Sequence, residues 1–177
     1  MRGVHKGLTS GQHLLCVLSG AHVRSPRDMP DPLKLAALDA DDLSVVSAHV
    51  QDAVLRSAHI VYDPKIGGVV LPLNRFAWET PGTRRWLFKT HERRRAVLHI
   101  DRVRGVRAKG VDRRDDKQVL SLLSVTFIPK TEDDPSGLIE LIFAGDASMH
   151  LEVECVEVRM SDVGGTWETR SKPKHTP

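Results

Sequence analysis

Apolar and polar residues alternate in about seven short segments between residues 58 and 154. A period of two places every second side chain on one face of a β-strand, so this pattern predicts strands with one buried face. Gly145 and Asp146 separate the last two segments, and that dipeptide favours a tight hairpin. The predicted strands are residues 59–63, 69–76, 96–100, 103–109, 119–128, 139–143 and 149–153.

Two further segments have the spacing of a helix. Residues 41–56 carry apolar side chains on one helical stripe, and Asp39 and Asp41 before it supply N-cap chemistry. Residues 155–163 place Val156, Met160 and Val163 on one helical face, and the pair of glycines that follows is typical of a helix end. The pattern therefore predicts one helix on each side of the strand series.

Together these elements predict an α+β fold. It has an N-terminal helix, a mostly antiparallel sheet of about seven strands rolled into a partly open barrel, and a short C-terminal helix. This element order resembles the topology of pleckstrin-homology-like barrels, a likeness of order that implies no lipid binding. The phase of the alternation slips at Asp101-Arg102 and near Leu122, which predicts a corner and a bulge there. Expected core residues are Val46, Val50, Ile60, Leu98, Ile100, Val125, Phe127, Leu141, Phe143, Leu151 and Val153.

The length of 177 residues fits one globular domain, which we expect over residues 30–168. Residues 1–29 are expected to be a disordered extension or translated sequence upstream of a true start at Met29, and residues 169–177 a flexible tail. A signal peptide is a weaker reading, because the apolar patch at residues 14–18 is shorter than the ~7–15 residues such a peptide needs.

Two cysteines far apart, Cys16 and Cys155, provide no disulfide framework and no CxxC site. They suit a reducing cytoplasm, where we expect the protein to be located. No apolar run approaches the ~20 residues of a membrane-spanning helix, so no membrane association is expected.

Positive charge is concentrated in residues 84–117, which hold 13 of the 26 basic and 5 of the 23 acidic residues. Interleaved arginine and aromatic side chains can contact phosphates and stack on bases. Arginines on a strand can equally protect a sheet edge, or be solvated surface charge. The candidate residues for binding an anion or a partner are Arg84, Arg85, Trp86, Arg93, Arg94, Arg95, Arg102, Arg104 and Arg107.

No catalytic or cofactor motif is present in the chain, so we expect no catalytic residues, no cofactor and no bound metal. A metal site would need His99 to converge with His150, Glu152 and Glu154, whereas alternating polar residues are typical of any solvated strand face. The leading hypothesis is a non-enzymatic cytoplasmic module that binds a partner protein or stabilises an assembly. One alternative is a binder of nucleic acid or another polyanion through residues 84–117. The second is an enzyme whose site is not visible as a motif.

Three separated segments resemble one uncharacterised alphaproteobacterial family. They are residues 33–43 (LKLAALDADDL), 74–79 (NRFAWE) and 151–155 (LEVEC), and they occur in the same order. The family is the domain of unknown function numbered 2948. The resemblance covers about residues 29–167, and it implies no activity and no site residues.

Overall fold

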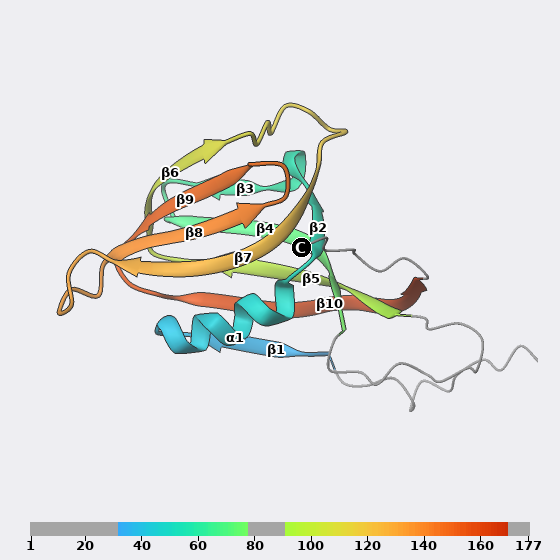
Figure 1. The fold of residues 1–177 in the computed structure, drawn as a ribbon, viewed down its shortest axis with the longest axis horizontal. Helices are drawn as coiled ribbons and strands as arrows, with labels where there is room; N and C mark the ends of the chain where they lie inside the picture. Colours follow the sequence, from blue (N-terminus) through green and yellow to red (C-terminus); the bar gives the residue numbers. More distant parts are fainter. Residues whose placement is uncertain (1–31, 78–90, 170–177) are drawn as a thin grey trace, which may run out of the picture. The chain divides into compact units, whose positions relative to one another are not determined.

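The alternating segments form β-strands in the computed structural model, which describes residues 32–77 and 91–169 (Figure 1). Within these residues there are ten strands, one α-helix and one short 3-10 helix. The elements are β1 (Lys34–Ala37), α1 (Ala40–Val50), β2 (Ala53–Arg56), η2 (Ser57–His59), β3 (Val61–Asp63), β4 (Gly68–Phe76), β5 (His91–Ile100), β6 (Val103–Lys109), β7 (Val119–Pro129), β8 (Gly137–Phe143), β9 (Ser148–Val153) and β10 (Val158–Thr169).

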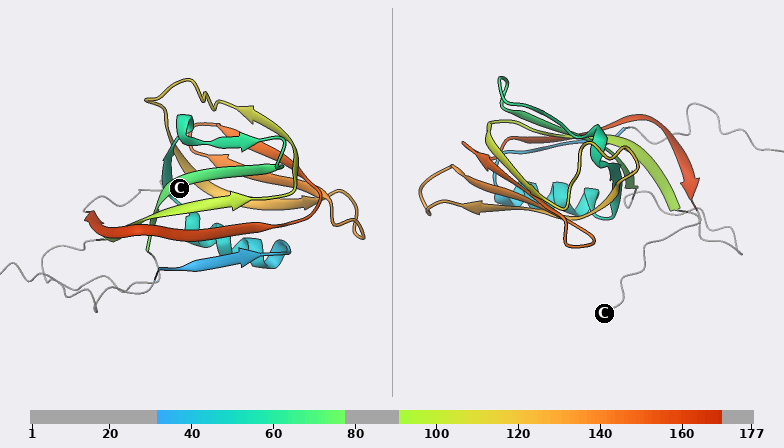
Figure 2. Two further views of the ribbon diagram at one scale, coloured as in Figure 1. Left: turned by 180° about the vertical axis from the view of Figure 1, so that it is seen from behind. Right: turned by 90° about the horizontal axis from the view of Figure 1, so that it is seen from above.

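The strands build one antiparallel sheet in the order β1-β10-β5-β4-β2-β7-β8-β9-β6, and β3 pairs with β4 beside β2. The sheet bends at β2, which meets β4 in a single residue pair, Val54 with Asn74. Seen from above, the parts of the sheet on either side of this bend lie in two layers that face each other (Figure 2). The apolar faces of the two layers enclose the core.

The core consists of the inward side chains of both layers and of α1. Ten of the eleven expected core residues are buried, and Phe127 is half-buried. Helix α1 packs against β7, β1 and β4 through Leu43, Val46 and Val50. Helix α1 therefore covers the space between the β1 edge of one layer and β7 of the other.

The first helix begins where the sequence predicts and ends earlier. The Asp39 carboxylate accepts a hydrogen bond from the Asp42 amide at 2.8 Å and caps the helix. The helix ends at Val50, and Asp52 has a φ of 60°, which a helix cannot continue through. The predicted end at residue 56 was wrong, because Ala53 and Leu55 are buried with a period of two and belong to β2.

The predicted C-terminal helix, residues 155–163, was wrong. These residues lead into β10, in which Val158, Met160 and Asp162 point inward with a period of two. The prediction failed because the inward Asp162 interrupts the apolar alternation of this strand. The remaining apolar residues, Val156, Met160 and Val163, then fit the spacing of a helix. The α+β fold with a closing helix, and with it the pleckstrin-homology-like barrel, is therefore corrected to a mostly antiparallel, unclosed ten-stranded sheet with one α-helix.

The corner, the bulge and the hairpin predicted from the sequence are confirmed. The chain turns from β5 to β6 at Arg102, which has a φ of 60°. The register of β7 against β8 shifts between Leu122 and Ser124. Gly145 and Asp146 lie in the turn that joins β8 to β9, and both have positive φ angles, 77° and 58°.

All described residues belong to one compact unit. The expectations for residues 1–29 and for the tail beyond residue 169 fall on residues outside the described ranges. Among the residues described, no helix has both the length and the apolar character needed to cross a bilayer.

Candidate partner-binding groove

The predicted basic residues are divided among three environments. Arg84, Arg85 and Trp86 lie outside the described residues. Arg102, Arg104 and Arg107 lie exposed at the start of β6 and along it. The run of three arginines, residues 93–95, lies on β5 and is split between the two faces of the sheet.

The arginines near β6 are paired with carboxylates. Arg102 Nε lies 3.1 Å from Glu157 Oε2, and this hydrogen bond raises the pKa of Arg102. Arg104 Nε lies 3.0 Å from Glu154 Oε1, and Arg107 bonds to Glu152. Cross-strand pairs of this kind balance the charge locally, so this face offers an incoming anion little uncompensated positive charge.

The three consecutive arginines of β5 have three different roles. Arg94 points inward and is buried. Arg93 places its guanidinium carbon 4.0 Å from the centre of the Phe76 ring, a cation–π contact. Burial lowers the pKa of Arg93, and the Asp52 carboxylate offsets part of that shift. Arg95 points outward and is exposed.

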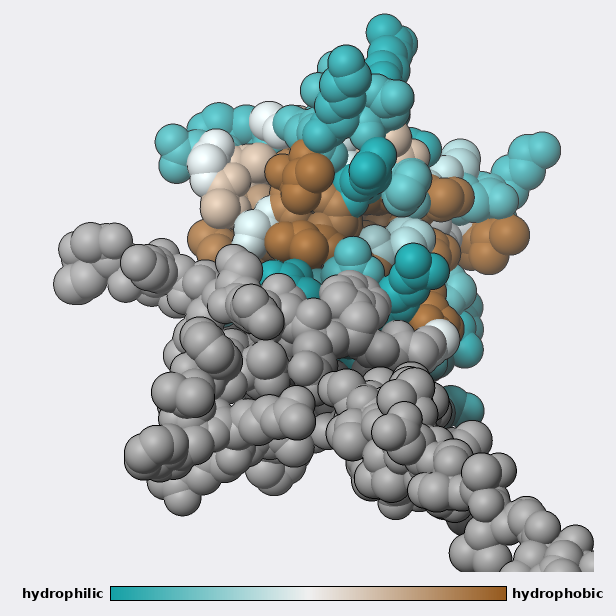
Figure 3. Space-filling view, turned by 90° about the vertical axis from the view of Figure 1, so that its right-hand side faces the viewer, coloured by the Kyte–Doolittle hydropathy of each residue, from teal (hydrophilic) through white to brown (hydrophobic). Residues whose placement is uncertain are grey.

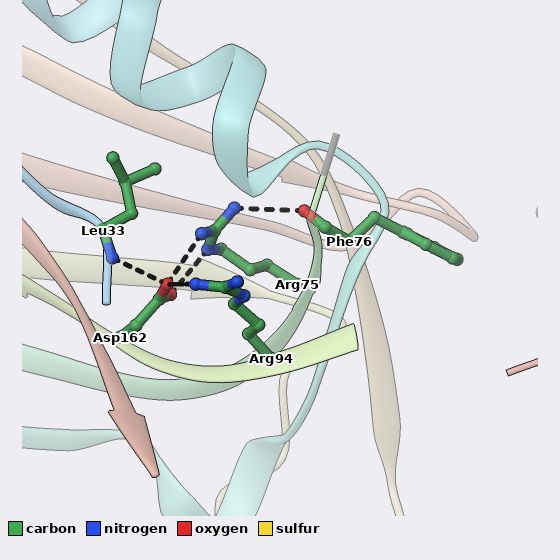
Figure 4. Close-up of polar contacts among 5 residues, drawn as sticks. All are labelled: Leu33, Arg75, Phe76, Arg94 and Asp162. Atoms are coloured by element: carbon green, nitrogen blue, oxygen red, sulfur yellow. Dashed lines mark hydrogen bonds and ion pairs between the residues drawn. The ribbon is translucent and has the colours of Figure 1, made fainter. Parts of the chain in front are cut away.

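Asp162 is the centre of a buried ion cluster (Figure 4). Its carboxylate takes two hydrogen bonds from Arg75, Nε to Oδ1 at 2.7 Å and Nη2 to Oδ2 at 2.9 Å. Arg94 Nη1 donates to Oδ2 at 3.3 Å and the Leu33 amide donates at 3.0 Å. Arg75 also donates to the Phe76 carbonyl at 3.1 Å. The cluster thus joins β4, β5 and β10 to the residue that precedes β1.

This cluster is structural. Burial alone raises the pKa of Asp162, but the hydrogen bonds from Arg75 and from the Leu33 amide outweigh it and hold the pKa below its ordinary value. Within the described ranges, every buried side-chain nitrogen and oxygen has a hydrogen-bond partner. Sequence reasoning missed Arg75 and Asp162; the available signal was that Arg75 continues the inward phase of Leu71 and Leu73 along β4.

A groove of about 560 Å³ runs over β2, β4 and β5, and we call it the outer groove. Figure 3 looks onto the end of the domain where β2 lies and shows apolar surface between hydrophilic side chains there. Val54, Asn74 and Arg95 alternate with buried core residues along their strands, so their side chains face away from the core. The outer groove is lined by Val54, Leu55, Arg56, His59, Pro72, Leu73, Asn74, Arg95, Ala96, Val119 and Val163.

The shape of the groove follows from a gap in strand pairing. Along β4, Val70 is the last residue paired with β3, and Asn74 is the only one paired with β2. Pro72 lies between them, and proline has no amide hydrogen that would need a strand partner. Pro72 therefore lies beside this gap without leaving an unpaired amide.

The charged side chains in the described lining of the outer groove are all basic. Its described lining includes Arg56, His59 and Arg95 and contains no aspartate or glutamate. Arg56 Nη1 donates only to the carbonyl of Asp116, at 3.3 Å. Neither Arg56 nor Arg95 forms an ion pair within the part of the chain that the structure describes. A carboxylate brought into the groove therefore finds free guanidinium donors beside apolar side chains.

A second depression, of about 390 Å³, lies at the β7–β8 turn. Arg104 and Lys130 line it together with Glu152. Arg104 already pairs with Glu154, and Glu152 pairs with Arg107 and places a carboxylate in this lining. The outer groove is the better candidate for recognition of an anionic group.

The four groups considered for a metal site are engaged separately. His150 Nε2 lies 2.9 Å from Glu140 Oε1, and His99 Nε2 lies 3.4 Å from Asp101 Oδ1. Glu152 and Glu154 bond to the arginines of β6. Over residues 32–77 and 91–169, no three histidine, cysteine or acidic side chains are grouped so that they could hold a metal ion. Cys155 is a free cysteine and is half-buried.

Comparison with known proteins identifies one family. A family model described as "Protein of unknown function (DUF2948)" matches residues 33–175, more than half of the chain. No curated protein and no solved structure matches the chain. The resemblance based on three sequence segments is confirmed, and the alphaproteobacterial source stays a prediction.

Proposed function

The chain belongs to the DUF2948 family, which transfers no activity to it, and from the outer groove we propose that it is a non-enzymatic protein-interaction module that binds an acidic segment of a partner protein. One observation carries the proposal: Arg56 and Arg95 flank apolar side chains in a groove whose described lining has no carboxylate. Six of the other described arginines are paired with acids, whereas Arg56 and Arg95 lie in the groove without an acid partner among the described residues.

The size and chemistry of the outer groove support a short segment as its occupant. A volume of about 560 Å³ lies within the roughly 300–1,000 Å³ of sites that bury a compact ligand. Val54, Pro72 and Val163 supply apolar contact area, while arginine binds carboxylates in a planar, two-pronged geometry. A segment that carries both an acidic and an apolar side chain satisfies both parts of the lining.

The nucleic-acid alternative remains a prediction for residues 84–117. Within the described part of that segment, Arg94 is buried, and Arg102, Arg104 and Arg107 are paired with glutamates. These engagements reduce the charge available for phosphates, and the protein-partner proposal is therefore placed first. A cytoplasmic location is part of the same proposal, and it is supported by the two isolated cysteines.

The test is site-specific photo-cross-linking in the native cell. A photoreactive amino acid replaces Val54 in the outer groove and, as a control, Val61, which is 52% exposed on β3 outside it. The proposal expects cross-links from position 54 to one protein, mapped by mass spectrometry to an acidic segment. They should be lost when Arg56→Gln and Arg95→Gln are added. Equal capture from both positions, or capture abolished by nuclease, overturns the proposal.

A further inference from the structure

The outer groove has a fixed spacing between its charged and apolar parts. Arg95 on β5 lies opposite Asn74 on β4, and Asn74 lies opposite Val54 on β2. These three residues form a cross-strand row that runs perpendicular to the strands. Neighbouring strands lie about 4.8 Å apart, so the backbones of Arg95 and Val54 are separated by roughly 9.6 Å measured along the sheet.

A segment laid along the cross-strand row must present its acidic and apolar groups at that same spacing. In a polyproline II helix, residues i and i+3 lie on the same side and roughly 9.3 Å apart, because there are three residues per turn and a rise of about 3.1 Å. In a β-strand, residues on one side repeat every ~6.6 Å. One such repeat is shorter than the spacing of the row, and two repeats, roughly 13 Å, are longer. The polyproline II repeat therefore matches the groove.

An α-helix can also match the distance, with residues seven apart at roughly 10.5 Å. A helix with side chains is about 10–12 Å wide, so seven residues occupy a cylinder of roughly 800–1,200 Å³. The outer groove holds about 560 Å³. The slimmer polyproline II segment is the occupant that the space favours.

Asn74 supplies the remaining element of recognition. It lies in the middle of the cross-strand row, is half-buried and lines the groove. A polyproline II backbone makes no internal hydrogen bonds, so its carbonyl and amide groups need partners when it docks. The Asn74 amide group both donates and accepts and lies where such a backbone crosses the strands.

Resting on the proposed function, we infer that the outer groove binds a polyproline II segment with an acidic and a large apolar side chain three residues apart. The carboxylate of the bound segment pairs with Arg95, and its backbone crosses Asn74. Its apolar side chain packs on Val54 and Pro72. The same spacing is presented in either chain direction, so the motif is Glu-x-x-Leu or Leu-x-x-Glu with prolines between.

The experiment uses the full chain and fluorescein-labelled peptides. Four have identical composition: one carries Glu-Pro-Pro-Leu, one its reverse order, and two place Glu and Leu two or four residues apart. A fifth peptide, alanine-rich and with a spacing of seven, represents the helix. In fluorescence anisotropy, one of the two peptides with a spacing of three should bind at least about fivefold more tightly than every other spacing. Loss of one charge-assisted hydrogen-bonded contact weakens binding by tenfold or more, so Arg95→Gln should lower the affinity by about tenfold.

Arg159→Gln is the matched control. Arg159 is exposed, lies outside the outer groove, and pairs with Asp101 at 2.5 Å. It should leave peptide affinity unchanged. The preference for a spacing of three is refuted by any of four results. These are equal affinity for all spacings, a preference for the helical peptide, equal losses of affinity in both variants, or no binding up to about 1 mM. If peptides fail this test but photo-cross-linking from position 54 still captures an acidic segment, only the preference for a spacing of three is refuted. If photo-cross-linking also fails, the proposed function is refuted as well.

Discussion

Replacing Asp162 by asparagine should remove a large part of the stability of this domain. The carboxylate accepts two hydrogen bonds from Arg75, one from Arg94 and one from the Leu33 amide. An asparagine keeps the shape but turns one acceptor into an NH₂ group, which then faces a donor. Removing one partner of a buried ion pair costs about 3–5 kcal/mol, and the retained oxygen places this variant near 3 kcal/mol.

Urea unfolding, followed by far-ultraviolet circular dichroism, measures this loss. With a slope of about 1.5 kcal/mol per M, typical of a small domain, a loss of 3 kcal/mol lowers the midpoint by about 2 M. Glu154→Gln is the control, because it breaks an exposed pair with Arg104, which contributes at most about 1 kcal/mol. Equal midpoints for the two variants, with an unchanged slope, would refute the assignment of Asp162 as the centre of a stabilising cluster.

Two other outcomes follow from the same structure. Because the pKa of Asp162 is lowered in the folded state, its contribution is complete above the unfolded value of about 3.9 and is lost as the pH falls through the lower folded pKa. The difference in unfolding free energy between wild type and Asp162→Asn should therefore be constant from pH 7 to 5 and shrink below about pH 4. Urea titrations at each pH measure it, and a difference that grows on acidification contradicts the prediction. Gly137→Ala should lower the unfolding free energy by about 1–3 kcal/mol in the same assay, because its methyl group would meet the Ile128 carbonyl and lie 2.6 Å from the Phe127 ring. Gly105→Ala should cost far less, because its methyl group would lie 3.3 Å from the end of the exposed Glu152 side chain and not against backbone. Equal losses would show that this steric argument fails.

The sequence predicted the strands best where each inward position is apolar. The segments 96–100, 139–143 and 149–153 each carry an uninterrupted alternation, and each is a strand or lies within one. At β10 the inward Asp162 broke the pattern, so a helical period fitted equally well. At β2 the chain changes from helix to strand within two residues around Asp52, and a short strand of alternating small apolar residues cannot be distinguished from a continuing helix.

The candidate site was less predictable, because it depends on which distant strands are neighbours. Arg95 was identified as basic, but its row with Asn74 and Val54 exists only once β5, β4 and β2 have paired. A run of three arginines also conceals that alternate residues on a strand face opposite sides. Arg94 supports the fold, so replacing residues 93–95 together would test stability along with binding.

The ion cluster also constrains the order in which this protein can mature during synthesis. β10 lies between β1 and β5 in the sheet, although it is the last strand in the described part of the chain. A ribosome must therefore release Asp162 before Arg75 and Arg94 acquire this counter-ion and before β1 acquires its strand partner. Until then the nascent chain keeps the edges of β1 and β5 exposed, which is the state in which chaperones are most needed. The pairing of β1 and the contacts of Asp162 can therefore form only after β10 has been translated.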